Sequence, residues 1–254
     1  MSLHAKRVVA VVEARMTSSR LPGKVLLPAS GKPLLQILVE RLQRVDRLDE
    51  IVIATTVNTT DNPIVELAQR LGVAAFRGSE ADVLDRVVQC LQTRRAEICV
   101  EVTGDCPLVD PLIVNEALDA FAAAPDRTYV SNSDPHRSVP AGLDVQVFSA
   151  GALCELDREA TDPADREHVS YGFYRPESGN RWRPHFIKHA STVGAEKLWL
   201  SLDHREDYEL IKALHEEVGE RTTGYGAREI IAWVRAHPEM HARCLALRPG
   251  WAME

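Results

Sequence analysis

The feature that most constrains the fold is the alternation of two kinds of segment in the first half of the chain. Short apolar runs at residues 7–12, 51–55, 73–76 and 98–102 are typical of buried parallel strands, because they are β-branched and too short for helices. Stretches with the helical period separate them, at residues 33–45, 63–71 and 82–95. The order βαβαβαβ predicts a parallel sheet with right-handed crossovers.

The second half of the chain is less regular and predicts additions to that sheet. Residues 145–148 and 183–189 are expected as strands, and residues 149–159, 165–174 and 205–218 as helices. We therefore expect an α/β protein, a three-layer α/β/α fold with a mostly parallel, Rossmann-like sheet and a small antiparallel extension. A single domain is expected over residues 1–237, followed by a weakly specified tail at residues 238–254.

Charge and hydropathy exclude two classes of partner. The net charge of -7 over 254 residues lacks the basic excess that binding a nucleic-acid backbone requires, although a local basic pocket for a polyphosphate stays compatible. The chain contains no apolar run of about 18 residues that could span a bilayer. Residues 1–7 lead directly into a predicted strand and not into a signal-peptide core. We expect a cytoplasmic protein with no nucleic-acid and no membrane partner.

Cysteine and histidine spacing gives no metal or disulfide pattern. The five cysteines form no Cys-x-x-Cys pair, so neither a disulfide framework nor a tetrathiolate zinc site is indicated. The nine histidines lack the His-Glu-x-x-His and His-x-His spacings that bring two imidazoles onto one metal. Reduced, structural thiols are expected.

The loop after the first predicted strand has the composition of a phosphate-binding loop. Its sequence, EARMTSSRLPGK at residues 13–24, carries Arg15, Arg20 and Lys24 around two serines. Guanidinium groups grip phosphate oxygens with two donors each, and the lysine adds a compact charge. Ligands of parallel sheets bind beyond the carboxyl ends of the strands, where this loop lies, which favours phosphate binding over the alternative of a solvated basic loop. The P-loop and dinucleotide-binding glycine patterns are both absent from the sequence.

Two aspartates that follow apolar runs are candidate metal ligands. Asp105 comes after the run at residues 98–102, behind Gly104, which permits close backbone approach. Asp203 ends the run at residues 199–203, just before a charged helix. Magnesium prefers oxygen ligands and commonly takes one or two protein carboxylates. The alternatives are a turn or capping role for Asp105 and an N-cap role for Asp203, with Asp207 as the other candidate for the second ligand.

Several segments occur together in the order of one known family. They are RMTSSRLPGK at residues 15–24, GKPL at 31–34, VIATT at 52–56, FRGSEADVLDR at 76–86, TGDCPL at 103–108, SN at 131–132, GLDV at 142–145 and REHV at 166–169. Over roughly residues 7–215 the chain resembles the spore-coat polysaccharide cytidylyltransferase-like family, which is related to the enzymes that make CMP-Kdo and other CMP-activated acidic sugars. It departs from the family at Glu13, where members often carry glutamine, and at Thr17, where many carry glycine.

The resemblance implies an activity. It implies Mg²⁺-dependent transfer of a cytidylyl group from CTP to a sugar-like, acidic acceptor, with release of pyrophosphate, in the synthesis of surface polysaccharide or glycan precursors. It also implies a sheet of the nucleotide-diphospho-sugar transferase type, a nucleotide-binding half at about residues 1–127, an acceptor-binding or dimer half at about residues 128–237, and a homodimer. Two alternatives stay open. One is a glycosyltransferase that uses a nucleotide sugar, although Asp105 is not part of an Asp-x-Asp element. The other is a nucleotide-binding protein without catalysis.

The resemblance also implies roles for individual residues. It assigns catalysis to Arg15, Lys24 and Asp105, and it favours Asp203 over Asp207 as the metal ligand that acts with Asp105. Nucleotide contacts are expected from a larger set: Ala14, Arg15, Ser18, Ser19, Arg20, Lys24, Thr55, Gly78, Ser79, Thr103 and Gly104. Acceptor contacts are expected from Arg86, Asp144, Arg166 and His168, with an exposed arginine and a structural histidine as the alternatives for Arg86 and His168.

Overall fold

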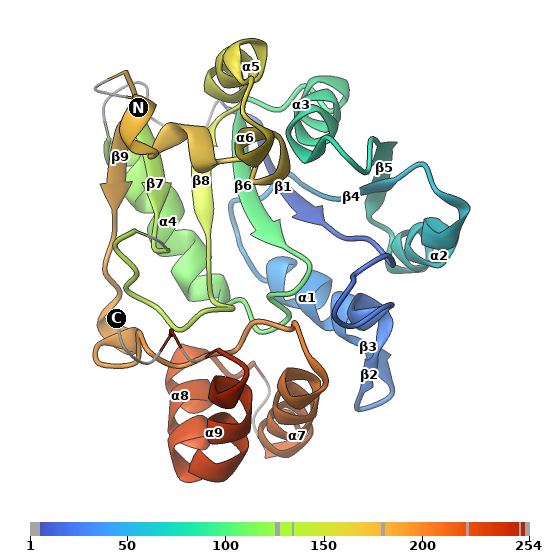
Figure 1. The fold of residues 1–254 in the computed structure, drawn as a ribbon, viewed down its shortest axis with the longest axis vertical. Coiled ribbons are helices and arrows are strands. Elements are labelled where there is room, and N and C mark those ends of the chain that lie inside the picture. Colours follow the sequence, from blue (N-terminus) through green and yellow to red (C-terminus); the bar gives the residue numbers. More distant parts are fainter. Residues whose placement is uncertain are drawn as a thin grey trace.

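The parallel half of the sheet has the predicted order. The computed structural model describes residues 6–124, 128–133, 135–178, 181–221, 224–248 and 250–251, so the start of the chain at residues 1–5 lies outside it. The strands β1 (Val8–Glu13), β4 (Glu50–Thr56), β5 (Ala74–Gly78) and β6 (Ile98–Thr103) pair in parallel, in the spatial order β5-β4-β1-β6 (Figure 1). The four predicted strands are therefore confirmed.

The helices between these strands are also confirmed. They are α1 (Leu34–Leu42), α2 (Asn62–Leu71) and α3 (Val83–Thr93). Helix α2 ends at Gly72, which has a φ of 68°, a left-handed conformation that glycine adopts without steric cost. Two 3-10 turns belong to the same half, Lys24–Leu26 in the loop after β1 and Thr59–Asp61 before α2.

The second half of the chain extends the sheet. Strands β8 (Gln146–Ser149), β7 (Thr128–Ser131) and β9 (Arg183–Phe186) follow β6 in space and complete seven strands. Strand β8 runs antiparallel to both β6 and β7, whereas β7 and β9 are parallel to each other. A separate two-stranded antiparallel sheet consists of β2 (Pro28–Ala29) and β3 (Lys32–Pro33). The expected mostly parallel sheet with antiparallel additions is confirmed.

Helices cover both faces of the sheet and make three layers. Alternate residues of β1 serve the two cores: Val8, Ala10 and Val12 face one, and Val9 and Val11 face the other. The first core takes in α1, α2 and α4 (Pro111–Ala123), and also α7 (Arg205–Arg221), α8 (Ala227–Ala236) and α9 (Pro238–Ala246). The second takes in α3 and α5 (Ala150–Glu159). The strands therefore bury both faces, as their continuous apolar sequence requires.

Two segments differ from the sequence-based expectation. A helix was expected at residues 165–174, but α6 covers only Pro163–Glu167, and a 3-10 turn follows at Tyr171–Phe173. The break turns Val169 and Phe173 into the second core, where they are 1% and 2% exposed. A weakly specified tail was also expected from residue 238, which is wrong for residues 238–246, because α9 forms there and buries Cys244 completely.

The topology fixes where a ligand site can form. After β1 the chain forms β4 and β5 on one side of β1 and then returns to form β6 on the other side of β1. A crevice opens at the sheet edge where this direction reverses. Backbone bonds join the loops there: Gly104 N donates to Glu13 O at 2.8 Å and Ala14 N to Ala54 O at 3.2 Å. A Cβ at Gly104 would lie 2.8 Å from Glu13 O, so this approach requires glycine.

Among the described residues, no helix combines the length and apolarity needed to cross a membrane.

Candidate active site

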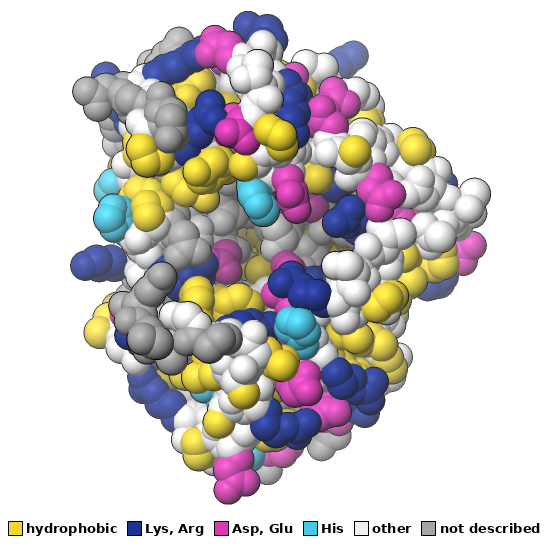
Figure 2. Space-filling model, viewed as in Figure 1, with side chains coloured by type: hydrophobic (Ala, Val, Ile, Leu, Met, Phe, Trp, Pro, Cys, Tyr) yellow, Lys and Arg dark blue, Asp and Glu magenta, His cyan; other side chains and the backbone are white. Residues whose placement is uncertain are grey.

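A cleft lies at this crevice and brings together much of the predicted site. Its cavity volume is about 590 Å³, and Figure 2 shows the hollow on this face of the molecule. Eleven of the residues predicted from sequence line it: Ala14, Arg15, Ser18, Ser19, Arg20, Lys24, Arg86, Thr103, Gly104, Asp105 and His168. The remaining lining residues are Glu13, Val25, Val83 and Glu167. Residues from the loops after β1 and β6 thus share a cavity with residues of α3 and α6.

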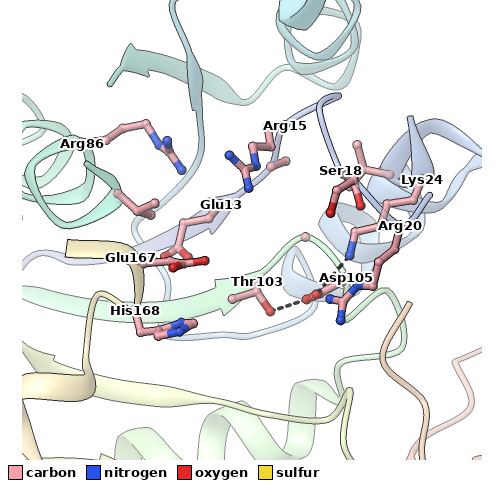
Figure 3. Close-up of a pocket in the computed structure, with 15 residues that line it drawn as sticks. Glu13, Arg15, Ser18, Arg20, Lys24, Arg86, Thr103, Asp105, Glu167 and His168 are labelled. Carbon is pink, nitrogen blue, oxygen red and sulfur yellow. Dashed lines mark hydrogen bonds and ion pairs between the residues drawn. The ribbon is translucent and has the colours of Figure 1, made fainter. Parts of the chain in front are cut away.

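Lys24 joins two aspartates at one end of the cleft. Its Nζ lies 3.3 Å from Asp105 Oδ2 and 3.1 Å from Asp203 Oδ1 (Figure 3 shows the contact with Asp105). Arg20 donates to the same Asp203 oxygen at 2.6 Å. Gly23, with a φ of 71°, precedes the 3-10 turn that begins at Lys24. Asp203 is not among the residues that line the cavity, but its carboxylate contacts two that do.

A backbone bond holds the two aspartates beside each other. The amide of Leu202 donates to the carbonyl of Asp105 at 2.9 Å, so the strand-like run that ends at Asp203 crosses the carboxyl end of β6. Thr103 Oγ1 donates to Asp105 Oδ1 at 2.5 Å and fixes the orientation of that carboxylate. The side chains of Asp105 and Asp203 are 26% and 7% exposed, so both are largely removed from solvent.

The donor set at this end fits a divalent cation. The ammonium of Lys24 already occupies the position between the two carboxylates, which shows that a positive charge is stable there. Within the described part of the chain, no three His, Cys, Asp or Glu side chains converge to form a closed metal cage. Two carboxylates leave coordination positions for water and phosphate oxygens, which is how magnesium is commonly held beside a nucleotide.

Asp207 has a different role from Asp203. Its Oδ2 accepts hydrogen bonds from the backbone N–H of Asp203 at 3.0 Å and of His204 at 2.7 Å, at the start of α7. The same oxygen lies 2.6 Å from a guanidinium nitrogen of Arg248. Asp207 therefore accepts from the backbone N–H groups just before the helix, while Asp203 faces Lys24.

The loop after β1 is anchored by Asp61, which the sequence analysis did not single out. Its Oδ1 accepts from the backbone N–H of Met16 at 2.8 Å, and its Oδ2 accepts from the hydroxyls of Thr55, at 2.9 Å, and Thr56. Burial alone would raise the pKa of Asp61, but these hydrogen bonds lower it below the usual carboxyl value. Thr55, predicted to contact the nucleotide, is fully buried in this network and does not line the cavity. The Thr-Thr pair six residues before Asp61 was the available sequence signal.

At the opposite end of the cleft, Arg86 lies near the acidic side chain of Glu13, which was not predicted as a site residue (Figure 3). Glu101, on the neighbouring strand β6, was not predicted either. Arg86 is 2% exposed, so it is not the exposed arginine considered as an alternative. Burial and the charge of Glu101 raise the pKa of Glu13 well above its usual value, although Arg86 lowers it. Burial raises the pKa of Glu101 to about 7. Oε1 of Glu13 and Oε2 of Glu101 have no hydrogen-bond partner.

Gly78 and Ser79, predicted to contact the nucleotide, hold Arg86 in place. A Cβ at Gly78 would lie 2.8 Å from Arg86 Cγ, so a side chain there would displace the arginine. The carbonyl of Ser79 accepts a hydrogen bond from Arg86 at 2.5 Å, and its hydroxyl accepts one from the amide of Asp82 at 3.0 Å. Neither residue lines the cavity.

The four predicted acceptor contacts divide into two pairs. Arg86 and the exposed His168 reach the cavity, and the exposure of His168 argues against a buried structural histidine. Arg166 lies outside the cavity lining and binds Asp157, Asp82 and the carbonyl of Ala160. Asp144 also lies outside it and pairs with Arg137.

The segment around Asp144 packs against the chain that carries Asp203. Asp144 Oδ2 accepts from the amide of Gly142 at 2.7 Å. Gly142 has a φ of 100°, and a Cβ there would lie 2.4 Å from the carbonyl carbon of Leu200. The backbone of Ala141 is bonded to both Leu198 and Leu200. This segment therefore supports the run that ends at Asp203.

Comparison with known proteins identifies the family. The family model described as Cytidylyltransferase matches residues 9–225. The "Spore coat polysaccharide biosynthesis protein SpsF" of Bacillus subtilis (strain 168) is 34% identical over 91% of this chain and 95% of its own length. A cytidylyltransferase structure from Leptospira borgpetersenii is similar, with a TM-score of 0.83 and 28% identity over 93% of this chain and 97% of that one. A CMP:2-keto-3-deoxy-manno-octonic acid synthetase complexed with CTP shares the fold, with a TM-score of 0.61 and 20% identity over 84% of this chain and 99% of that one. This chain belongs to the cytidylyltransferase family and is a nucleotidyltransferase.

Proposed function

We propose that this cytidylyltransferase transfers a cytidylyl group from CTP to an oxygen of a sugar-like, acidic acceptor in a Mg²⁺-dependent reaction that releases pyrophosphate. The observation that carries the proposal is the convergence of Lys24, Asp105 and Asp203 beside the cationic loop after β1. The relative from Bacillus subtilis bears a name in spore coat polysaccharide biosynthesis, and the octonic acid synthetase structure contains CTP. Both support a role in polysaccharide or glycan precursor synthesis.

The proposed reaction is an in-line displacement. An acceptor hydroxyl oxygen forms a bond to the α-phosphorus of CTP, the bond from that phosphorus to the bridging oxygen breaks, pyrophosphate leaves, and the acceptor proton passes to solvent. No side chain acts as a nucleophile. The barrier falls because the reactants are positioned and because fixed charges stabilise the negative charge that develops on the leaving group.

The residues at the Lys24 end of the cleft divide this work. Asp105 and Asp203 would hold the divalent ion, which supplies Lewis-acid stabilisation of phosphate oxygens when bound. Lys24 and Arg20 neutralise these carboxylates in the structure and have phosphate oxygens as their other natural partners. Arg15 lines the same cavity with a side chain that is 45% exposed, so it can reach a triphosphate.

The remaining cavity residues are proposed to bind the two substrates. Ala14, Ser18 and Ser19 offer backbone and hydroxyl donors to the nucleotide, as do Thr103 and Gly104 from the loop after β6. Arg86 and His168, at the far end, are proposed to contact the acceptor. Thr55, Gly78, Ser79, Asp144 and Arg166 are assigned supporting contacts within the protein, because their partners are other parts of the chain. A homodimer stays a prediction.

A nucleotide and acceptor screen tests the proposal. Calorimetry with CTP and Mg²⁺ measures binding, and pyrophosphate release is then followed with each of the four nucleoside triphosphates over a panel of acidic sugars and phosphates. We expect pyrophosphate with CTP and at least one acidic sugar, and none without a divalent ion. Binding without turnover over the whole panel would favour the non-catalytic alternative. Consumption of a nucleotide sugar without pyrophosphate release would favour the glycosyltransferase.

A further inference from the structure

The segment after α9 returns to the Lys24 end of the cleft and delivers Arg248. This side chain is 11% exposed, and one guanidinium nitrogen lies 2.6 Å from Asp207 Oδ2 and 3.8 Å from Asp203 Oδ2. The other terminal nitrogen donates to the carbonyl of Cys244 at 2.7 Å. The guanidinium carbon lies 4.0 Å from the centre of the Trp199 ring, a cation–π distance. Arg248 is therefore held on three sides.

Asp207 connects Arg248 to the second proposed metal ligand. Its Oδ2 receives Arg248 and the backbone N–H groups of Asp203 and His204 together. Asp207 is 1% exposed, and its Oδ1 has no hydrogen-bond partner. Arg248 is the closest cation that the structure gives this deeply buried carboxylate. The orientation of the Asp207 carboxylate then fixes the backbone of Asp203.

The cations around Asp203 also differ in the partners that hold them. Arg20 contacts Asp203 with a side chain that is 56% exposed, and Lys24 has a second carboxylate partner in Asp105. Both therefore have alternative partners when phosphate oxygens enter the cleft. Arg248 is enclosed by Asp207, the Cys244 carbonyl and the Trp199 ring, and all three contacts lie outside the cavity lining.

We propose that Arg248 is a positioning residue, which acts through Asp207 to hold the Asp203 carboxylate where it shares a divalent cation with Asp105. The C-terminal segment is then a working part of the catalytic centre, although it lies outside the residues that the family model matches, 9–225. This inference rests on the proposed function, because it assumes a metal ion between Asp105 and Asp203. Groups that orient metal ligands typically contribute a factor of about 10 to 100 in metal affinity or activity.

The competing explanation is that Arg248 only fastens the C-terminal segment. Trp251 offers a matched control for that idea. Its ring packs edge-on against Trp199 at 4.8 Å between centroids, and its Nε1 donates to the carbonyl of Lys197 at 2.9 Å. Trp251→Ala therefore removes contacts of the same segment, including one to the same Trp199 ring, without removing a charge beside Asp207.

The test compares Arg248→Ala, Arg248→Lys and Trp251→Ala in the full chain. Mn²⁺ binding in the presence of CTP is measured by electron paramagnetic resonance, together with kcat, KM for CTP and the melting temperature. We expect Arg248→Ala to weaken Mn²⁺ binding and lower kcat by about tenfold each, with KM for CTP nearly unchanged. Arg248→Lys should recover most of the Mn²⁺ affinity, because it restores the charge beside Asp207. Trp251→Ala should lower the melting temperature but leave Mn²⁺ affinity within about twofold.

Two results would overturn the inference. One is an Arg248→Ala protein with the Mn²⁺ affinity and kcat of the wild type. The other is a Trp251→Ala protein that reproduces both losses, which would assign them to fastening of the segment. Asp105→Ala serves as the reference for loss of Mn²⁺. If the wild type binds no Mn²⁺ and forms no pyrophosphate, the proposed function fails first and the role of Arg248 falls with it.

Discussion

The two ends of the cleft hold acidic side chains in different surroundings. At the Lys24 end, Asp105 and Asp203 have cationic partners within 3.3 Å. At the far end, Glu13 has one nearby guanidinium, that of Arg86, and the charge of Glu101 also acts on it. Glu13 and Glu101 each have an oxygen without a hydrogen-bond partner. Burial raises the pKa values of both carboxyls, to about 7 for Glu101. The same kind of side chain is therefore paired with cations at one end of the cleft and buried with an unpaired oxygen at the other.

The largest effect should come from Lys24→Ala. This change removes the charge between the two aspartates, and turnover should fall by about a thousandfold because a fixed cation at the leaving group is lost. Arg205→Ala is the matched control, since Arg205 is a cation on α7 whose side chain is 64% exposed. Pyrophosphate release measures both variants, and circular dichroism checks that the fold is intact. An equal loss of turnover in the two variants would contradict the catalytic role proposed for Lys24.

The next effect separates Asp203 from Asp207. Asp203→Asn removes a proposed metal ligand, and it should abolish detectable Mn²⁺ binding and lower kcat by more than about a hundredfold. Asp207→Asn keeps an oxygen for the N–H groups of Asp203 and His204 but loses the charge that pairs with Arg248. We therefore expect kcat to fall by only about tenfold in this variant. Calorimetric titration with Mn²⁺ ranks the two variants. The reverse ranking would make Asp207 the ligand.

A third prediction concerns the pH dependence of stability at the far end. Because the folded-state pKa of Glu101 is raised, its favourable contribution is complete below about pH 4.5 and is lost as pH rises through about 7. Between pH 5 and pH 8 the wild type should lose up to about 3 kcal/mol of unfolding free energy through this group. Glu101→Gln should remove most of that loss. Urea denaturation at the two pH values measures it, and equal slopes with pH in both proteins would contradict the raised pKa.

The smallest effect is expected for Glu13→Gln, which introduces the residue often found in the family. The amide keeps the shape of the side chain and removes a carboxyl whose charged form is disfavoured by burial and by Glu101. The free energy of unfolding at pH 8 should therefore rise by about 1 kcal/mol. The kcat at pH 7 should stay within about threefold, because no catalytic or metal-binding role is proposed for Glu13. Parallel denaturation and pyrophosphate assays check both values. A kcat lowered a hundredfold would instead place the Glu13 carboxylate in the reaction.

The sequence predicted local features well and distant pairings poorly. The β-branched runs and the helical periods identified β1, β4, β5 and β6 because buried parallel strands need no partner to be recognised. The cationic loop was also predictable, because Arg15, Arg20 and Lys24 lie close together in the sequence. The contact of Lys24 with Asp203 joins residues 179 positions apart, and only the family resemblance indicated it.

Residues that act through other residues were harder to predict. Asp61 and Arg248 were not singled out, and Asp207 was considered only as an alternative metal ligand, because their partners are backbone amides or distant side chains. Helix α9 was not predicted because its apolar face consists of a few residues, chiefly Met240 and Cys244. Their contribution becomes visible only when they are seen packed against the first core. Glu13 and Glu101 lie on the paired strands β1 and β6, two residues out of register, because Glu101 is opposite Val11 and Glu13 is opposite Thr103. Their mutual effect on pKa therefore depends on that register.

The close approach of Gly142 to the carbonyl of Leu200 has a consequence for how substitutions in the second half of the chain are interpreted. Any side chain at position 142 must push Leu200 aside, and Asp203 is only three residues further along the chain. A loss of activity caused by a change at Gly142 would therefore be explained by a displaced Asp203 carboxylate. Intolerance at that glycine says nothing about which acceptor the protein uses.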